Sequence, residues 1–147
     1  MEWLNSDEID KQKPLVLRLY SPEDEPILLD FYPLRESDEP DWDPMPEDWM
    51  YYSEPLRIYK QDYTRLLLKY LAVIYPTKDA FDGTPAPEFD VCFDNWIGKD
   101  DWNRILDEIG NHSDEHDPKE KVFLNAFTGW IKEALKHTNI IVVLGNQ

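Results

Sequence analysis

The segment 117–144 constrains the possible folds of this chain most strongly. It combines the pattern of a long amphipathic helix with that of a strand that has no polar face. Asp117 offers a capping oxygen, Pro118 suits the first helical position, and Glu120 can reach back to the cap. Apolar residues then recur at spacings of three and four: Val122, Phe123, Ala126, Phe127, Trp130, Ile131, Ala134 and Leu135. This pattern predicts a helix of about 20 residues that ends near Lys136 and His137.

The run IIVVL at 140–144 follows that helix and is rich in β-branched residues. It shows no polar alternation, which is typical of a strand covered on both faces. We therefore expect this strand to lie inside a sheet, with helices packed against the sheet.

Three further strands are predicted. The run LVLRLY at 15–20 alternates with period two, and ILLDFY at 27–32 returns after a proline-rich turn, so the two are expected to form a hairpin that Pro33 ends. The run FDVCF at 89–93 also alternates and predicts a short strand.

Two more helices are predicted between these strands. Apolar residues at spacings of three and four over 56–75 indicate an amphipathic helix that Pro76 stops. Another helix is expected to begin near Asp100, whose carboxylate can cap free amides, and to end at Gly110.

The length of 147 residues is typical of one domain with its own core. We therefore predict a single α+β domain over 1–147. A small, mostly antiparallel sheet packs against about three helices, and the proline-interrupted segment 35–53 forms a long acidic loop.

The first ten residues are acidic, whereas a targeting segment would be basic and then apolar. The longest apolar stretch, 66–75, contains Lys69 and is shorter than the roughly 20 residues that cross a bilayer. The lone Cys92 excludes an internal disulfide framework and suits a reducing compartment. We expect a cytoplasmic protein without a membrane segment.

The net charge of −16 is unevenly distributed. Residues 1–54 hold 16 acidic and four basic residues, a net charge of −12, which leaves 15 acidic and 11 basic residues, net −4, in 55–147. Such a field repels nucleic acid and anionic lipid and attracts basic proteins. We therefore expect a basic protein partner and no direct binding to nucleic acid or membranes. The alternative is that the acidity only keeps the protein soluble.

The sequence DEPDWDPMPEDWMYY at 38–52 combines acidic and aromatic residues with three prolines and has no Lys or Arg. Its carboxylates repel one another unless a cation docks there, and tryptophan often dominates binding energy at interfaces. The predicted partner-binding residues are Asp38, Glu39, Asp41, Trp42, Asp43, Glu47, Asp48 and Trp49. The alternative is a surface loop whose aromatic side chains fold back onto the core.

Two histidines lie in a short polar segment with Asp114 and Asp117, and His112 and His116 are candidate ligands of a divalent metal. The spacing is not diagnostic of a metal site, and a solvated polar loop between two helices is the preferred explanation. We therefore predict no metal and no cofactor.

No residue offers a clear nucleophile. Cys92 lies opposite the phenylalanine face of 89–93, between Asp90 and Asp94, and carboxylates beside a thiol make it a poorer nucleophile. It is expected to be an inert, packed cysteine. The chain has neither a nucleophile-elbow serine nor a glycine-rich phosphate loop. We predict no catalytic residues and no enzyme activity.

In size, acidity, α+β pattern and acidic aromatic surface, the chain resembles the immunity proteins of bacterial toxin systems. The resemblance implies that it neutralises a cognate basic toxin, in some cases a nuclease. Carboxylates of the acidic loop would then stand where phosphates bind, with Trp42 or Trp49 as anchors. Two alternatives stay open: a nucleic acid mimic that inhibits a DNA-binding protein, and a small metal-dependent enzyme that uses His112 and His116.

Overall fold

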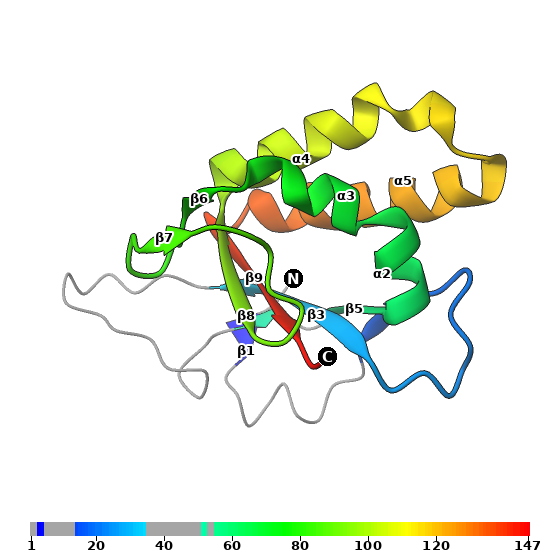
Figure 1. The fold of residues 1–147 in the computed structure, drawn as a ribbon, viewed down its shortest axis with the longest axis horizontal. Coiled ribbons are helices and arrows are strands. Elements are labelled where there is room, and N and C mark those ends of the chain that lie inside the picture. Colours follow the sequence, from blue (N-terminus) through cyan, green and yellow to red (C-terminus); the bar gives the residue numbers. More distant parts are fainter. Residues whose placement is uncertain (1–2, 5–13, 35–50, 53–54) are drawn as a thin grey trace.

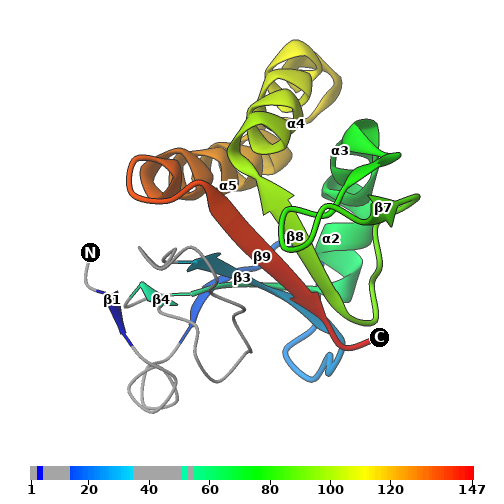
Figure 2. The same cartoon turned by 90° about the vertical axis from the view of Figure 1, so that its left-hand side faces the viewer.

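The computed structural model describes residues 3–4, 14–34, 51–52 and 55–147. Its main feature is a five-stranded sheet whose helices all lie on one face, as two perpendicular views show (Figure 1, Figure 2). The strands are β1 (Trp3–Leu4), β2 (Leu15–Leu17), β3 (Leu28–Leu34), β4 (Tyr51–Tyr52), β5 (Leu56–Tyr59), β6 (Thr77–Lys78), β7 (Pro85–Ala86), β8 (Asp94–Gly98) and β9 (Ile140–Gly145). The helices are α2 (Lys60–Leu66), α3 (Leu68–Leu71), α4 (Lys99–Asn111) and α5 (Pro118–Leu135), with short 3-10 helices η2 (Ala72–Ile74) and η3 (Ser113–Glu115).

The sheet has the strand order β2-β5-β3-β9-β8. All of its pairs are antiparallel except β2 with β5, which is parallel. Two small antiparallel pairs, β1 with β4 and β6 with β7, lie outside it. The predicted α+β class with a mostly antiparallel sheet is therefore confirmed. None of the helices in the described ranges has the length and apolar content needed to cross a membrane.

The core lies between the sheet and the helices. Alternate residues of β3 point into it, and Leu29 and Phe31 are fully buried. The Phe31 ring lies 5.5 Å from the ring of Phe127 on α5 and 6.2 Å from that of Trp102 on α4, measured between centroids. Because these aromatic side chains are completely enclosed, they account for much of the apolar area that stabilises the fold.

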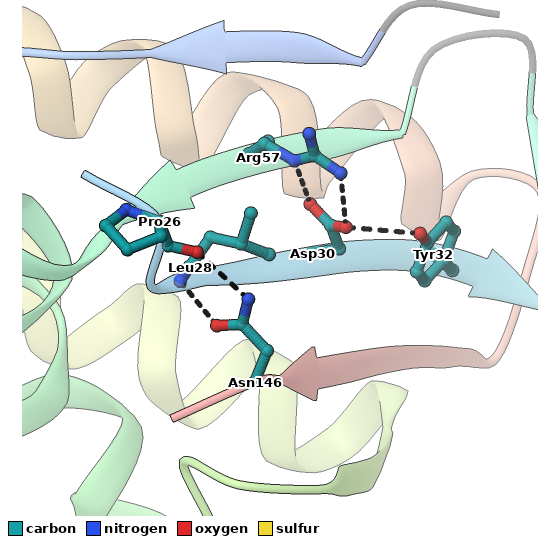
Figure 3. Close-up of polar contacts among 6 residues, drawn as sticks. All are labelled: Pro26, Leu28, Asp30, Tyr32, Arg57 and Asn146. Carbon is teal, nitrogen blue, oxygen red and sulfur yellow. Dashed lines mark hydrogen bonds and ion pairs between the residues drawn. The ribbon is translucent and has the colours of Figure 1, made fainter. Parts of the chain in front are cut away.

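The opposite face of the sheet carries an ion pair between neighbouring strands (Figure 3). Arg57 on β5 donates to both carboxylate oxygens of Asp30 on β3, at 2.8 and 2.9 Å, and the Tyr32 hydroxyl also donates to Asp30. The Asp30 side chain is only 9% exposed. Nearby, the Asn146 side chain accepts from Leu28 N and donates to the Pro26 carbonyl, which fixes the start of β3 to the end of β9.

The predicted C-terminal helix and strand are confirmed. The helix begins at Pro118, and the Asp117 side chain accepts the Glu120 amide at 2.9 Å as its cap. The expected strand is β9, which lies inside the sheet between β3 and β8, with Ile141–Val143 fully buried. A run without a polar face is stable here because strands flank it on both edges and side chains cover both faces.

The predicted hairpin of 15–20 with 27–32 is wrong, because β5 lies between β2 and β3. Residues 56–59 were expected to begin the helix and instead form β5, where Leu56 and Ile58 are buried and their neighbours only half-buried. A stretch as short as 56–59 is compatible with both a helical and an alternating pattern. Residues 56–59 form a strand because they pair with β2 on one side and β3 on the other. The rest of the predicted helix is divided into α2, α3 and η2.

Pro33 does not end β3, which continues to Leu34. Lys60 N donates to Ile27 O, so the odd-numbered residues of β3 direct their amides toward β5. Phe31 pairs with Leu56, the first residue of β5, so position 33 has no partner on β5. A proline there, which lacks an amide N–H, therefore removes no hydrogen bond between β3 and β5.

Residues 89–93 are not a strand; the edge strand is β8, which begins at Asp94. The Asn95 side chain accepts from Asp90 N and donates to Asp90 O, at 2.8 and 2.7 Å, which holds the preceding segment in a loop. Cys92 is consequently exposed and not packed.

The helix expected from Asp100 to Gly110 is α4, but its ends differ. Its first residue is Lys99, and Gly98 occupies the capping position without a side-chain hydrogen bond. Asp100 therefore lies in the first turn, where its charge favours the positive end of the helix dipole, and does not cap it. The helix continues one residue past Gly110, to Asn111.

Two glycines provide a matched test of the packing between β9 and the 89–93 loop. A Cβ added at Gly145 would lie 2.1 Å from the Val91 carbonyl oxygen, whereas one at Gly129 in α5 would meet nothing within 4 Å. Gly145→Ala is expected to lower the free energy of unfolding by about 1–3 kcal/mol, because the backbone must shift. Gly129→Ala should raise it by roughly 0.5–1 kcal/mol through better helix propensity. Urea unfolding would measure the free energy of unfolding of both variants. If the two substitutions changed it by the same amount, the close packing of Gly145 against Val91 would be contradicted.

The ion pair beneath the sheet gives a second prediction. Arg57→Met leaves the buried Asp30 carboxylate without its cation and should destabilise the fold by about 3–5 kcal/mol. The double variant Asp30→Leu/Arg57→Met should recover most of this loss, because no buried charge is left unpaired. Lys136→Met, which breaks an exposed pair with Glu133, is the control and should change stability by less than about 1 kcal/mol. If Arg57→Met and Lys136→Met lowered the free energy of unfolding by similar amounts, the Asp30 carboxylate would not depend on its ion pair with Arg57.

Candidate partner-binding surface

The partner-binding residues predicted from the sequence lie outside the described residues. These are Asp38, Glu39, Asp41, Trp42, Asp43, Glu47, Asp48 and Trp49. The long loop predicted over 35–53 also lies outside them, except for Tyr51–Tyr52, which form β4. The pairing of β4 with β1 shows only that the end of this segment meets the start of the chain.

The described residues contain a second stretch of similar composition. The segment 79–96, here called the 79–96 surface, carries acidic and aromatic residues, two prolines and no Lys or Arg. The acidic residues are Asp79, Asp82, Glu88, Asp90 and Asp94, and the aromatic residues are Phe81, Phe89, Phe93 and Trp96. The composition of 79–96 is as distinctive as that of 38–52, but the alternation of apolar residues at 89–93 predicts a strand there instead of a binding surface.

The first half of the 79–96 surface is a tight turn held by its own carboxylates. Asp79 accepts the Phe81 amide at 2.8 Å, and Asp82 accepts both the amide and the hydroxyl of Thr84. Gly83 has φ +74, a conformation that a residue with a side chain rarely adopts. The turn places the half-exposed Phe81 ring against Trp96, with 4.7 Å between ring centroids.

The second half presents an exposed aromatic side chain among acids. Phe93 is 67% exposed and lies between Asp90 and Asp94 in the sequence. The loop before it is fixed, since Gly145 N donates to the Phe93 carbonyl and Asn95 holds the Asp90 backbone. The structure therefore presents the Phe93 ring to solvent from a backbone that hydrogen bonds hold in place.

The carboxylates of this surface are close enough to affect nearby ionisations. Burial raises the pKa of Asp79, and the negative charges of Asp82 and Asp94 raise it further. Burial also raises the pKa of Tyr75, with added repulsion from Asp101, Asp79 and Asp90. Within the described ranges, no Lys or Arg forms an ion pair with Asp79, Asp82, Asp90 or Asp94. The 79–96 surface is thus negative and locally unneutralised.

His116 takes part in a hydrogen-bonded chain that the sequence did not reveal. Its Nδ1 lies 3.0 Å from Glu120 Oε1 and its Nε2 lies 2.5 Å from the Tyr70 hydroxyl. The Tyr20 hydroxyl donates to the other oxygen of Glu120. The predicted reach of Glu120 back to its own helix cap is therefore replaced by contacts with Tyr20 and His116, which join α5 to the segment after β2 and to α3.

The histidine arrangement does not favour a metal site. Both ring nitrogens of the buried His116 are engaged, while His112 lies between Glu108 at 2.8 Å and Glu115 at 3.1 Å. These hydrogen bonds, first that of Glu115 and then that of Glu108, raise the pKa of His112. Over the ranges that the structure describes, no group of three or more His, Cys, Asp or Glu side chains is arranged to hold a metal ion.

Asp62 is a buried carboxylate with a structural role. It is completely enclosed on α2, and its two oxygens accept the backbone amides of Leu19, Tyr20 and Ser21. The Ser21 hydroxyl in turn accepts the Asp62 amide at 3.1 Å. Asp62 thus fixes the bend after β2, and no residue near it in the sequence indicates this contact, because its partners are about 40 residues away.

Comparison with known proteins adds no family to these observations. No family model matches the chain, and neither the curated proteins nor the solved structures include a match.

The hydrogen-bonded Glu120 predicts a pH dependence of stability. The Tyr20 hydroxyl, and then His116, lower the pKa of Glu120 from its usual value of 4.5. A pKa that is lower in the folded state contributes stability above about pH 4.5 and loses it as the pH falls through the folded value. The stability gap between the native protein and Glu120→Gln should therefore be widest near neutral pH and shrink in acid.

Urea unfolding at several values between pH 3 and pH 7 would measure this gap. Glu133→Gln, at an exposed glutamate on the same helix, is the control and should show a much smaller gap at every pH. A Glu120→Gln gap that does not change with pH would contradict the role given to the ionised carboxylate.

Proposed function

We propose that this chain is a non-catalytic binding protein that docks a basic protein through acidic surfaces bearing exposed aromatic side chains. The observation that carries the proposal is Phe93, 67% exposed among carboxylates that form no ion pair with a described Lys or Arg. The acidic segment with Trp42 and Trp49 has the same chemistry and is proposed to act together with it.

The two parts of such a surface have separate roles in binding. Large aromatic side chains supply most of the binding energy where they enter a desolvated pocket of the partner. Surrounding charges orient the encounter and raise the association rate, which then falls as salt screens them. A cationic partner also relieves the mutual repulsion of Asp79, Asp82 and Asp94.

The resemblance to immunity proteins suggests the kind of partner. A bacterial toxin that acts on nucleic acid carries a cationic groove, and carboxylates of this chain would occupy the positions that phosphates take there. The inhibited complex would form in the cytoplasm, where the exposed Cys92 stays reduced. We propose toxin neutralisation as the biological outcome of this binding.

The proposal is tested by finding the partner and then measuring what binding does. The tagged chain is used to capture proteins from its native organism, and a captured protein is identified, purified and titrated against the chain by calorimetry. A basic partner that binds one to one, and whose toxicity in a bacterial host is suppressed by co-expression of this chain, is the expected result. An acidic partner, or a partner whose toxicity is unchanged, would refute toxin neutralisation.

Variants then locate the contact. Phe93→Ala, Trp42→Ala and Trp49→Ala should each weaken partner binding about tenfold or more while circular dichroism shows an unchanged fold. The double variant Asp41→Asn/Asp43→Asn should mainly slow association and flatten its salt dependence. Asn125→Ala, an exposed site on α5, is the control and should leave binding unchanged. If the aromatic variants bind normally, the interface lies elsewhere.

A further inference from the structure

A groove between β2 and the first half of α5 has chemistry opposite to that of the 79–96 surface. Its volume is about 400 Å³. Its lining is Val16, Leu17, Arg18, Leu19, Lys119, Val122, Phe123 and Ala126. Six of these eight side chains are apolar, the other two are cationic, and none is acidic. We call it the β2–α5 groove.

One wall of the groove is an edge of the sheet. Among the described strands, β2 pairs only with β5. Leu15 N donates to Pro55 O on the β5 side, so by strand alternation the N–H and C=O of Val16 point the other way. This edge offers backbone donors and acceptors to another extended segment.

The apolar walls are exposed on both sides. Val122 on α5 is 70% exposed, and Val16 on β2 is 39% exposed. Exposed valines on facing elements can cover an apolar side chain that enters between them, which removes area from water on both partners.

The cationic residues that line the groove favour an occupant with acidic side chains. The chain has 31 acidic and 15 basic residues, yet the charged residues that line the groove are Arg18 and Lys119. The Arg18 guanidinium lies 4.6 Å over the ring of Tyr59, which places its charge beside the β2 edge on the face of the sheet opposite α5. An anionic side chain of an occupant is therefore favoured here, in contrast to the rest of this negative protein.

We propose that the β2–α5 groove binds an extended segment of a partner protein in which apolar and acidic residues alternate. The segment adds to the sheet as a strand beside β2, with its backbone bonded to Val16. Its apolar side chains enter the groove on the α5 side, and its carboxylates, on the other face of the added strand, meet Arg18. This inference does not depend on the proposed function, because the basic partner would dock on the acidic surfaces and this segment would dock here.

A second copy of the chain is a weaker candidate for the same groove. Two molecules that each carry a net charge of −16 repel one another, and pairing two β2 strands would bring the cationic residues of both copies together. Dimerisation is therefore treated as an outcome that would overturn the proposal.

The test uses the full chain labelled with ¹⁵N and two synthetic peptides, one alternating valine with glutamate and one alternating valine with lysine. The glutamate peptide is expected to shift the amide signals of residues 15–19 and 119–126, and the lysine peptide is not. Equal binding of the two peptides, or no shift at millimolar glutamate peptide, overturns the proposal.

Two variants and one matched control locate the binding. Val122→Glu places an acid on an exposed groove position and should weaken the glutamate peptide about tenfold or more. Val16→Pro removes an edge amide that does not bond to β5 and should also weaken it, with the fold retained. Asn103→Glu adds the same charge at an exposed site on α4 and should have little effect.

The variants also separate the two possible occupants. Normal peptide binding by both Val122→Glu and Val16→Pro would overturn the proposal. So would a concentration-dependent dimer, seen by analytical ultracentrifugation, that Val122→Glu abolishes.

Discussion

The pairing of β3 with β9 is the contact on which the rest of the structure depends. It joins residues 28–34 to the last strand of the chain, with Phe31 opposite Val143, and it lies in the middle of the sheet. Within the described residues, the α-helices α2 to α5 all belong to the sequence between these strands, so they cover the sheet only when β9 takes its place. Closing so long a loop is unfavourable in entropy, and the buried side chains of Phe31, Trp102 and Phe127 compensate for it.

The acidic residues fall into two groups with different physical roles. Asp30, Asp62 and Glu120 each accept hydrogen bonds from named donors, and such carboxylates hold strands and helices together. On the 79–96 surface, Asp79, Asp82 and Asp90 accept amides or a hydroxyl within two residues of themselves, and Asp94 accepts the Trp96 indole N–H. These carboxylates bond only within their own short segment, which is why we propose recognition as their role.

The elements that were predicted correctly are those whose signals are local. Pro118 and Asp117 mark the start of α5, and the β-branched run of β9 can be stable only inside a sheet. The elements missed depend on distant residues. Residues 56–59 become a strand because β2 and β3 flank them, and 89–93 becomes a loop because Asn95 and Gly145 hold its backbone.

For the candidate site, too, the local features could be predicted from the sequence and the features that depend on distant residues could not. Composition alone predicts a binding role for 38–49, and the same criterion applied to 79–96 would predict one for the surface with Phe93. The link from Tyr20 through Glu120 and His116 to Tyr70 spans separations of up to 100 residues, and no spacing rule reveals it. The same holds for the β2–α5 groove, which exists only because β5 displaces β2 to the edge.

The strand order gives the molecule two ends of unlike polarity. Strand β2, with its cationic groove, forms one edge of the sheet, and β8, which follows the exposed Phe93, forms the other. Three strands separate these edges, so ligands bound at the two ends would not compete for space. A protein that binds as proposed at both edges would act as a connector between a cationic molecule and an anionic peptide.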